Sequence, residues 1–354
     1  MLKIIHCADV HLGSKMEAKL PKYKAEERRV ELRKTFQNMV EFAKKEGVRA
    51  ILLAGDVFDS DRPFKRDKEF FYEVVKGTPE IDFLYLRGNH DGKESYVEGG
   101  IPNLKTFQET WTGYDYGEVY VCGLEMTEEN ALSLYATLTL DPKCKNIVAL
   151  HGQIGSVSGM DKIHLNKLAD KNVDYLALGH IHSYEENKLD DRGRYAYSGC
   201  LEGRGFDECG EKGFVLLEID KEINSRFVPF AKRQIRECVV ALGATQTRYE
   251  AYLAVKKEIL FAEDLYRIHL TGEIDYERDG LAEEIEKMLE GACYFISVKD
   301  ETEQKLDASM YEGDLSLVGE FVRNVLEKEN WSAEWKSKVV QLGLKALSHR
   351  EVDG

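Results

Sequence analysis

The sequence lacks the features of a membrane-embedded, secreted or disulfide-stabilised protein. No apolar run approaches the roughly 20 residues that a helix needs to cross a bilayer. The N-terminus, MLKIIHCADVHLG, is too short and too polar for a signal peptide. The seven cysteines are odd in number and include no CxxC pair, which is typical of reduced thiols in the cytosol. We therefore expect a soluble cytoplasmic protein with no membrane segment.

An excess of positive charge is also missing. Among 354 residues, 64 are acidic and 49 are lysine or arginine, so the formal net charge is −15. Proteins bind DNA largely by neutralising its phosphates with lysine and arginine, so this chain is expected to bind DNA weakly by itself. Either the substrate is small, or a partner supplies the basic surface.

The first 230 residues alternate apolar, strand-like runs with helical patterns, as α/β domains do. Apolar runs lie at 2–8, 48–54, 81–87, 146–150 and 173–179. Residues 23–46 predict a helix that Gly47 ends. Its apolar positions at helical spacing are Val30, Phe36, Val40 and Ala43. A polar cluster follows each apolar run at its carboxyl end, and α/β folds place their functional sites at this end of the strands.

The pattern changes in the last third of the chain. Residues 213–242 favour antiparallel strands, and residues 246–298 alternate helix, strand, helix and strand, which predicts a small separate α/β domain. The charged stretch from Lys299 to Asp314 has few large apolar residues and is interpreted as a linker. Two amphipathic helices follow, the second with Ser332 as a candidate N-cap, and their short connection predicts a helical hairpin.

Five clusters of candidate ligands follow the strands. They are Asp9-x-His11, Asp56-x-x-Asp59, Asn89-His90-Asp91, His151 and His180-x-His182. Alternate side chains of an extended chain point to the same face, so each D-x-H or H-x-H pair can offer two ligands to one site. Asp56 is the predicted bridge, because the two oxygens of a carboxylate can ligate two metals. Asp59 is either a group that orients a ligand or a turn residue.

The candidate ligands are imidazole, carboxylate and amide groups without a thiolate, which favours manganese, iron, zinc or cobalt. Two such ions roughly 3.5–4 Å apart can clamp the attacking and leaving oxygens of a phosphate and activate water as the nucleophile. A single histidine at a strand end is more often structural than a ligand, but five clusters in this order are hard to explain structurally. The histidines outside the clusters, interpreted as structural or solvated, are His6, His164, His269 and His349.

The order D-x-H, G-D-x-x-D, G-N-H-D, H, G-H-x-H resembles that of the calcineurin-like metallophosphoesterases. Four local sequences are similar to the SbcD branch of the double-strand-break repair nucleases: CADVHLG at 7–13, AGDVFDSDRP at 54–63, LRGNHD at 86–91 and SGCLEGRGFDECGEKGF at 198–214. The resemblance is strong over residues 1–230, moderate over 231–300 and weak over 301–354.

The resemblance implies a role for each clustered residue. One divalent ion, manganese in most of the family, would be held by Asp9, His11, Asp56 and His182. The other ion would be held by Asp56, Asn89, His151 and His180. His90 would protonate the leaving oxygen and would be oriented by Asp91. Some family members carry a second histidine at the place of Asp59, so catalytic help from that imidazole is absent here.

The implied fold is of the α/β class, a four-layer αββα sandwich with the metal site at one edge of its two sheets. Residues 1–230 would form the nuclease domain, residues 231–300 a small capping α/β domain, and residues 301–354 a linker and a C-terminal helical hairpin for partner binding. The implied protein is a DNA exonuclease and endonuclease of double-strand-break repair and recombination. Its implied partner is an SbcC-like coiled-coil ABC-type ATPase, in a heterotetramer built on a nuclease homodimer.

Two alternatives stay open. The first is a phosphodiesterase or phosphatase that acts on nucleotides, phosphoproteins or other small phosphoesters. The sequence GDVFDSDRP argues against the serine/threonine phosphatases, which continue G-D-x-x-D with R-G. The second alternative is a metal-bearing subunit that binds DNA ends without catalysis, and the complete ligand set together with His90 argues against it.

Overall fold

The predicted α/β class is confirmed by the computed structural model, which divides the chain into two compact units, Met1–Arg236 and Glu237–Gly354. The residues that it describes are 1–16, 20–95, 100–156, 159, 161–276, 278–304, 311 and 313–347. None of the helices in the described part of the chain has both the length and the hydropathy that a bilayer crossing needs.

Two six-stranded sheets form the first unit. The first sheet, in the order β14-β13-β1-β2-β3-β4, consists of Ile223–Pro229, Gly213–Ile219, Leu2–Cys7, Ala50–Ala54, Asp82–Leu86 and Leu104–Thr106. The second, in the order β11-β12-β10-β7-β6-β5, consists of Glu185–Lys188, Arg194–Tyr197, Tyr175–Gly179, Lys145–His151, Val119–Gly123 and Thr112–Asp115. Strands β1 to β4 pair in parallel, as do β6, β7, β10 and β12. A further small ribbon pairs β8, Gln153–Ile154, with β9, Lys162–Ile163.

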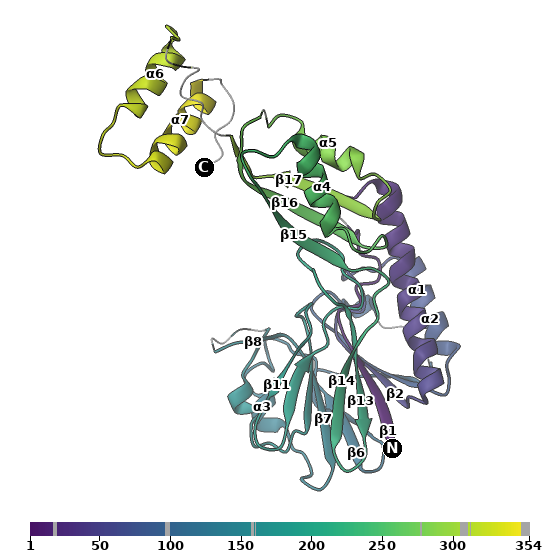
Figure 1. Cartoon of the computed structure of the whole chain (residues 1–354). Coiled ribbons are helices and arrows are strands. Elements are labelled where there is room, and N and C mark those ends of the chain that lie inside the picture. The colour runs from purple at the N-terminus through teal and green to yellow at the C-terminus, as the bar shows by residue number, and fades with distance from the viewer. Residues whose placement is uncertain are drawn as a thin grey trace. The chain divides into compact units, whose positions relative to one another are not determined.

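Helices cover the outer faces of both sheets. The first sheet is covered by α1, Lys22–Glu46, and α2, Lys65–Lys76 (Figure 1). These helices bury Phe36 and Phe71 against the strands. Side chains of both sheets share an inner core, in which Leu52 and Ala149 are fully buried. The outer face of the second sheet packs against a short helix, α3, Leu134–Thr137, the 3₁₀ turn Leu165–Lys167 and the ribbon of β8 and β9. The layer order is the predicted αββα.

Helix α1 confirms the predicted helix over residues 23–46. Gly47 ends it in the left-handed conformation, with φ 68°. The prediction for Val30 is wrong, because this side chain is 52% exposed. The buried face of α1 instead includes Arg28 and Glu31. The Arg28 guanidinium donates a hydrogen bond to the Glu31 carboxylate in the interior.

The second unit contains a sheet with helices on one face. Its strands are β15, Ile235–Leu242, which begins in the first unit, β16, Leu265–Ile274, β17, Phe295–Asp300, and β18, Glu303–Gln304. Helices α4, Arg248–Glu258, and α5, Leu281–Met288, bury Val255 and Ile285 against it. Because β18 pairs with β16, the sheet continues past residue 300 and the predicted linker at Lys299 begins too early. Residues 305–310 and 312 of that linker lie outside the described residues.

The predicted C-terminal hairpin is present as α6, Leu317–Leu326, and α7, Ala333–Leu347. The Ser332 hydroxyl accepts a hydrogen bond from the Trp335 amide at 3.2 Å, as expected of an N-cap. Val322 and Val340 are fully buried between the two helices. The small core of the hairpin therefore comes from its own two apolar stripes.

Candidate metal centre

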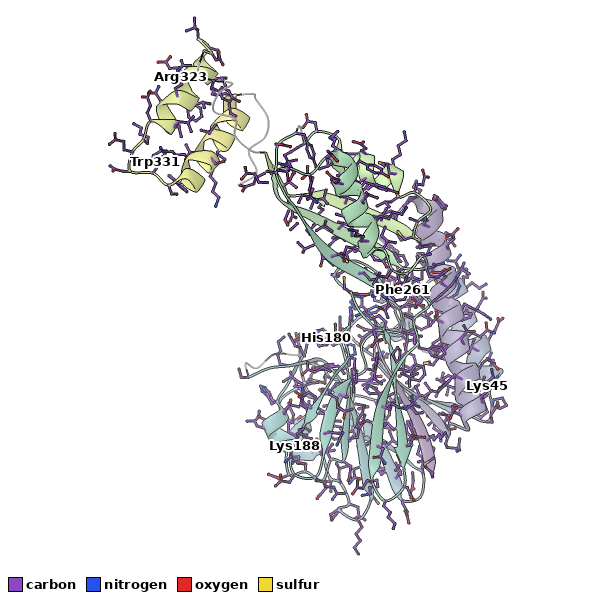
Figure 2. All side chains as sticks on the ribbon, in the orientation of Figure 1. Lys45, His180, Lys188, Phe261, Arg323 and Trp331 are labelled. Atoms are coloured by element: carbon purple, nitrogen blue, oxygen red, sulfur yellow. The ribbon has the colours of Figure 1, made fainter. Side chains whose placement is uncertain are left out.

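Each predicted ligand lies at or just after the carboxyl end of a strand in the first unit. Asp9 and His11 follow β1, Asp56 follows β2, Asn89 follows β3, His151 ends β7, and His180 and His182 follow β10. Figure 2 labels His180 at this end of the sandwich. Because these strands run parallel within their sheets, their carboxyl ends bring ligands from both sheets to one edge.

The backbone at this edge is not extended. Asp9 and His11 both have φ 51°, Asp56 has φ 52°, and His180 has φ 100°. The expectation that strand alternation places Asp9 and His11 on one face is therefore wrong, since a left-handed turn brings them together. Such conformations cost on the order of 1–3 kcal/mol each for residues other than glycine. Backbone hydrogen bonds hold this turn, from the Asp9 amide to the Gly55 carbonyl at 3.0 Å and from the His11 amide to the Asp56 carbonyl at 2.9 Å.

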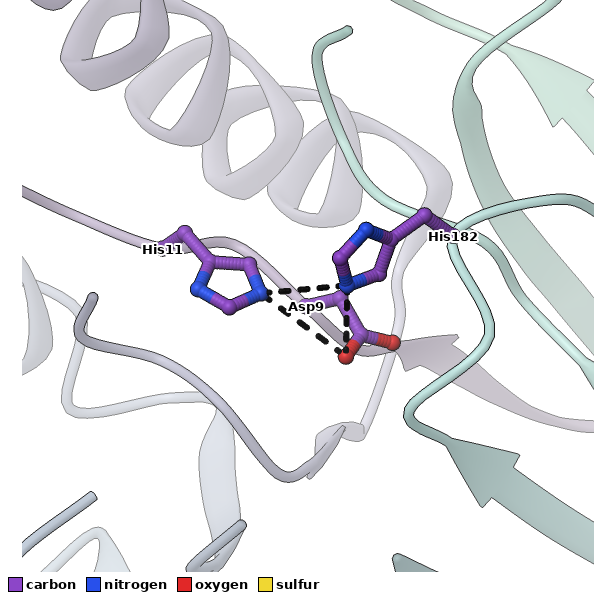
Figure 3. A group of neighbouring side chains, drawn as sticks. All are labelled: Asp9, His11 and His182. Atoms are coloured by element: carbon purple, nitrogen blue, oxygen red, sulfur yellow. Dashed lines mark hydrogen bonds and ion pairs between the residues drawn. The ribbon is translucent and has the colours of Figure 1, made fainter. Parts of the chain in front are cut away.

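Asp9, His11 and His182 form the first ligand group (Figure 3). Nε2 of His11 lies 3.3 Å from Nε2 of His182. Oδ1 of Asp9 lies 4.0 Å and 3.7 Å from these two nitrogens. Three atoms with lone pairs thus face one small space.

Asn89, His151 and His180 form the second group, together with Asp56. Oδ1 of Asn89 lies 3.0 Å from Nε2 of His151 and 3.1 Å from Nδ1 of His180. Nε2 of His151 lies 3.3 Å from Oδ2 of Asp56. The other ring nitrogen of His151 is 2.9 Å from the Ala54 carbonyl, which can only accept. His151 therefore carries its proton on Nδ1 when neutral, and Nε2 keeps its lone pair for a metal.

Asp56 lies between the two groups. Its Oδ2 is 3.3 Å from Nε2 of His151 and 3.9 Å from Nε2 of His11, while its Oδ1 accepts a hydrogen bond from the His90 amide at 2.8 Å. Asp56 would therefore contribute to the binding of both ions. The position of Asp56 between the groups is compatible with the predicted bridge, which stays a prediction.

The charges of the centre are strongly coupled. Burial alone would lower the pKa of His151, but its bond to Asp56 outweighs burial and raises that pKa to about 9. Burial alone would raise the pKa of Asp56, and the same histidine instead lowers it well below its usual range. Burial lowers the pKa of His11, which favours the neutral imidazole that can ligate a metal.

His90 and Asp91 do not interact as predicted. The Asp91 carboxylate accepts hydrogen bonds from the amides of Val57, Phe58 and Gly88 at 2.9–3.1 Å. Nδ1 of His90 is instead 3.2 Å from the carbonyl oxygen of Asp59. Burial, and next the charge of Asp56, raise the pKa of Asp91 to about 7. Asp91 therefore shapes the loop around the ligands, and the orientation of the His90 ring comes from a backbone carbonyl.

Two glycines make room for the ligands. A Cβ atom at Gly55 would lie 2.0 Å from Nδ1 of His151, and one at Gly88 would lie 2.2 Å from Oδ1 of Asp56. Any side chain at either position would displace a ligand.

Arg204 and Glu208 are close to the centre, although sequence reasoning gave them no role. Glu208 lies 2.7 Å from Nδ1 of His182, and Asp59 lies 3.1 Å from Nδ1 of His11. Arg204 forms ion pairs with both carboxylates, at 2.6 Å to Glu208 and 2.9 Å to Asp59. The signal for these residues was the motif at 198–214, which contains Arg204 and Glu208 four positions apart.

The donor set fits two divalent cations. Nitrogen and oxygen atoms with lone pairs converge from both sides on Oδ2 of Asp56, within a largely buried centre. Facing acceptors without a cation repel one another, whereas mixed imidazole and carboxylate ligands suit first-row metals.

Residues 2–184 match the protein family described as calcineurin-like phosphoesterase. The DNA double-strand break repair protein Mre11 of Saccharolobus solfataricus is 26% identical over 340 residues, which cover 88% of this chain and 86% of that protein. The protein of the same name from Sulfurisphaera tokodaii is 25% identical over 328 residues, covering 86% and 82% of the two chains. The uncharacterized metallophosphoesterase YhaO of Bacillus subtilis is 28% identical over 239 residues, covering 62% and 57%.

Proposed function

The chain belongs to the calcineurin-like phosphoesterases, and from this premise we propose that it is a two-metal DNA exonuclease and endonuclease of the SbcD type. Oδ2 of Asp56 carries the proposal, because it faces a ligand group on each side. The similarity to the two Mre11 proteins supports DNA as the substrate, since it covers 88% and 86% of this chain and is not confined to the phosphoesterase region.

The two ions, which we assign as Mn²⁺, would be held by residues of both sheets. One would be held by Asp9, His11, Asp56 and His182, and the other by Asp56, Asn89, His151 and His180. When bound, such ions stabilise charge on the phosphate oxygens and activate water. Two distances support this assignment, because Oδ2 of Asp56 lies 3.9 Å from Nε2 of His11 and 3.3 Å from Nε2 of His151.

His90 is the proposed general acid. Its Nδ1 is directed to the Asp59 carbonyl, so Nε2 is the ring atom that can give a proton to the leaving oxygen. The ring is exposed and lies 5.1 Å from the His11 ring, which puts it beside the ligands and within reach of a substrate. Asp91 supports the loop rather than the ring.

A partner is part of the proposal because the chain is acidic. With a net charge of −15, the isolated protein is expected to bind duplex DNA weakly and with a shallow salt dependence. We propose that a coiled-coil ABC-type ATPase of the SbcC kind supplies basic surface, within a heterotetramer built on a nuclease homodimer in the cytoplasm. The predicted domains at 1–230, 231–300 and 301–354 would then serve catalysis, capping and partner binding.

The same acidic charge favours one other function, hydrolysis of nucleotides or other small phosphoesters. A small substrate needs no extended basic surface, and bound ions would supply the positive charge locally. A metal-bearing subunit without catalysis is the less favoured alternative, because His90 accompanies the complete ligand set.

The deciding experiment compares three substrates with the purified full chain, with and without Mn²⁺. Single-stranded DNA, duplex ends and bis(p-nitrophenyl) phosphate are incubated in parallel, with Asp56→Asn as the metal-site control. We expect Mn²⁺-dependent cleavage of DNA and of the small diester, both lost in the control. Cleavage of the small diester without any DNA cleavage, in the presence of the ATPase partner, would favour the small-phosphoester function instead.

A further inference from the structure

We infer that Arg204, Asp59 and Glu208 form a clamp that orients His11 and His182, so that this clamp sets the affinity of one of the two ions and leaves the other unaffected. The inference rests on the proposed metal-binding role of the two histidines. It assigns the three clamp residues as positioning residues.

Each clamped histidine meets a carboxylate through the ring nitrogen that faces away from the ligand space. Nδ1 of His11 is 3.1 Å from Oδ1 of Asp59, and Nδ1 of His182 is 2.7 Å from Oε1 of Glu208. A carboxylate can only accept, so the shorter contact, with Glu208, favours a neutral His182 that carries its proton on Nδ1, while the Arg204 guanidinium lies 3.0 Å from the same nitrogen. The contact of His11 with Asp59 is within ion-pair distance but lacks hydrogen-bond geometry. Nε2 of His11 and Nε2 of His182 face one another and Asp9. Such outer partners fix the tautomer and raise the basicity of a ligating histidine.

Arg204 joins the two carboxylates. Its Nη1 donates to Oδ1 of Asp59 at 2.9 Å, while its Nε and Nη2 donate to Oε1 of Glu208 at 3.0 and 2.6 Å. Its own amide donates to Oε2 of Glu208 at 2.7 Å. Because a guanidinium is planar and rigid, it holds the two carboxylates at a fixed separation and offsets their mutual repulsion. A lysine could not bond both carboxylates in this way.

The segment that carries Arg204 is anchored on helix α1. Arg28, which is 1% exposed, donates to the carbonyl oxygen of Gly203 at 2.9 Å and to Glu202 at 3.0 Å. Thr35 of the same helix donates to Glu202 at 2.6 Å. These buried bonds fix the backbone on the N-terminal side of Arg204. Buried hydrogen bonds to helix α1 therefore hold the backbone segment that carries the clamp.

The opposite half of the centre has no such clamp among the described residues. Nδ1 of His151 bonds the Ala54 carbonyl, which no side-chain substitution can remove. Nδ1 of His180 faces Asn89, which is itself a proposed ligand. One histidine pair is thus oriented by side chains and the other by backbone and ligand. This asymmetry leads us to expect that damage to the clamp weakens one ion selectively.

A different interpretation, a third cation between His11, Asp59 and His90, is less favourable. These three residues do lie close enough to hold an ion. The Arg204 guanidinium already occupies Oδ1 of Asp59, and its positive charge would oppose a cation there. His11 would also have to ligate through both ring nitrogens.

The test is a titration of the metal-free full-length protein with Mn²⁺ by isothermal calorimetry, with electron paramagnetic resonance to count coupled and isolated ions. We expect Arg204→Met and Glu208→Ala to weaken one of the two sites by roughly 10–100-fold, the usual cost of losing such a partner. The second site should keep its wild-type affinity. Glu208→Gln keeps one acceptor oxygen and should lose less than Glu208→Ala. Arg192→Met serves as the control, because Arg192 lies in the turn between β11 and β12 and forms its ion pair with Asp174, which is not a clamp residue.

Two outcomes would overturn the inference. One is wild-type affinity for both ions in Arg204→Met and Glu208→Ala, and the other is equal weakening of both sites in proteins with a native melting transition. If Arg204→Met does not fold, the graded pair Glu208→Gln and Glu208→Ala decides. Failure of the nuclease proposal would look different, since the wild-type protein would then bind two ions and still leave DNA intact.

Discussion

Nε2 of His11 and Nε2 of His182 lie 3.3 Å apart, with the second nitrogen of each ring directed at a carboxylate. If both rings carry their proton on Nδ1, both facing nitrogens have lone pairs, and a cation between them removes their mutual repulsion. A strained turn at His11 and a buried carboxylate at Asp9 add to the cost of the metal-free arrangement. Metal binding and folding stability should therefore be coupled in the first unit.

The first prediction concerns metal removal. Mn²⁺ that binds only the folded state at 100 times its dissociation constant should add about 2.7 kcal/mol of stability. Differential scanning calorimetry with Mn²⁺ and with a chelator should show a higher melting temperature in the metal-bound protein. The shift should shrink in His11→Ala, which loses a ligand from one ion. An identical melting temperature in metal and in chelator would contradict the proposed centre.

The second prediction separates His90 from Asp91. His90→Ala should keep both ions and the native melting temperature, yet lose roughly 10²–10⁴-fold in turnover of the small diester. Asp91→Ala should instead lower the melting temperature and the metal affinity, because it leaves the amides of Val57 and Phe58 without their acceptor. Metal content, melting temperature and turnover are measured on both variants. A His90→Ala protein that is purified without metal would refute its role as the acid.

The sequence was sufficient to place the candidate ligands at one edge of the sheets, because each one follows an apolar run; their role as ligands stays a prediction. The sequence alone places five runs that end in Asp, Asn or His at a common sheet edge, and Asp56 and His151 do meet there. The helix at 23–46 and the C-terminal hairpin could also be predicted, because apolar residues at helical spacing and capping residues are visible in the local sequence.

Other features depend on the tertiary structure and were missed. The left-handed turn at Asp9 is maintained by bonds to the segment around Gly55, which no local pattern reveals. Arg204 and Glu208 are 22 and 26 positions from His182, so their contact depends on how the intervening hairpin folds. Strand β18 was mistaken for linker because Glu303 and Gln304 are polar and lie in a charged stretch, and its pairing with β16 makes it a strand.

The third prediction is a pH dependence that comes from His6. This buried ring lies 3.0 Å from the Tyr175 hydroxyl and 3.2 Å from the Leu178 carbonyl, and burial lowers its pKa to about 3. The unfolded chain takes up a proton near pH 6.5 and the folded protein does not, so stability should fall as pH drops from about 6.5 toward 3. The slope approaches about 1.4 kcal/mol per pH unit.

Urea unfolding of the chelator-treated protein at several pH values measures this dependence. His6→Gln should be less stable at pH 8 because the buried bonds are disturbed, but its stability should fall less steeply below pH 6.5. The difference in slope between the two proteins isolates His6 from the other titrating groups. Parallel curves for the two proteins between pH 6.5 and 5 would show that His6 does not contribute.

The last prediction concerns the hairpin of α6 and α7. Its helices bury Val322 and Val340 between them, while Leu317, Trp335 and Leu342 remain 70%, 54% and 55% exposed. Apolar side chains exposed in this number on two short helices are typical of a surface that a partner covers. A helical groove of the proposed ATPase's coiled coil is a suitable occupant, since an amphipathic helix can lay its apolar face into it.

Truncation after Gly313 should therefore leave Mn²⁺ binding and hydrolysis of the small diester intact, because the whole metal centre lies before residue 237. The same truncation should abolish co-purification with the ATPase. Leu317→Glu and Leu342→Glu should weaken that association without unfolding the hairpin, whereas Tyr249→Ser, at a 60% exposed position of α4, serves as the matched control. A truncated protein that still co-purifies with the ATPase would show that the hairpin is not the docking element. Loss of metal binding on truncation would show instead that residues 314–354 contribute to the fold of the rest of the chain.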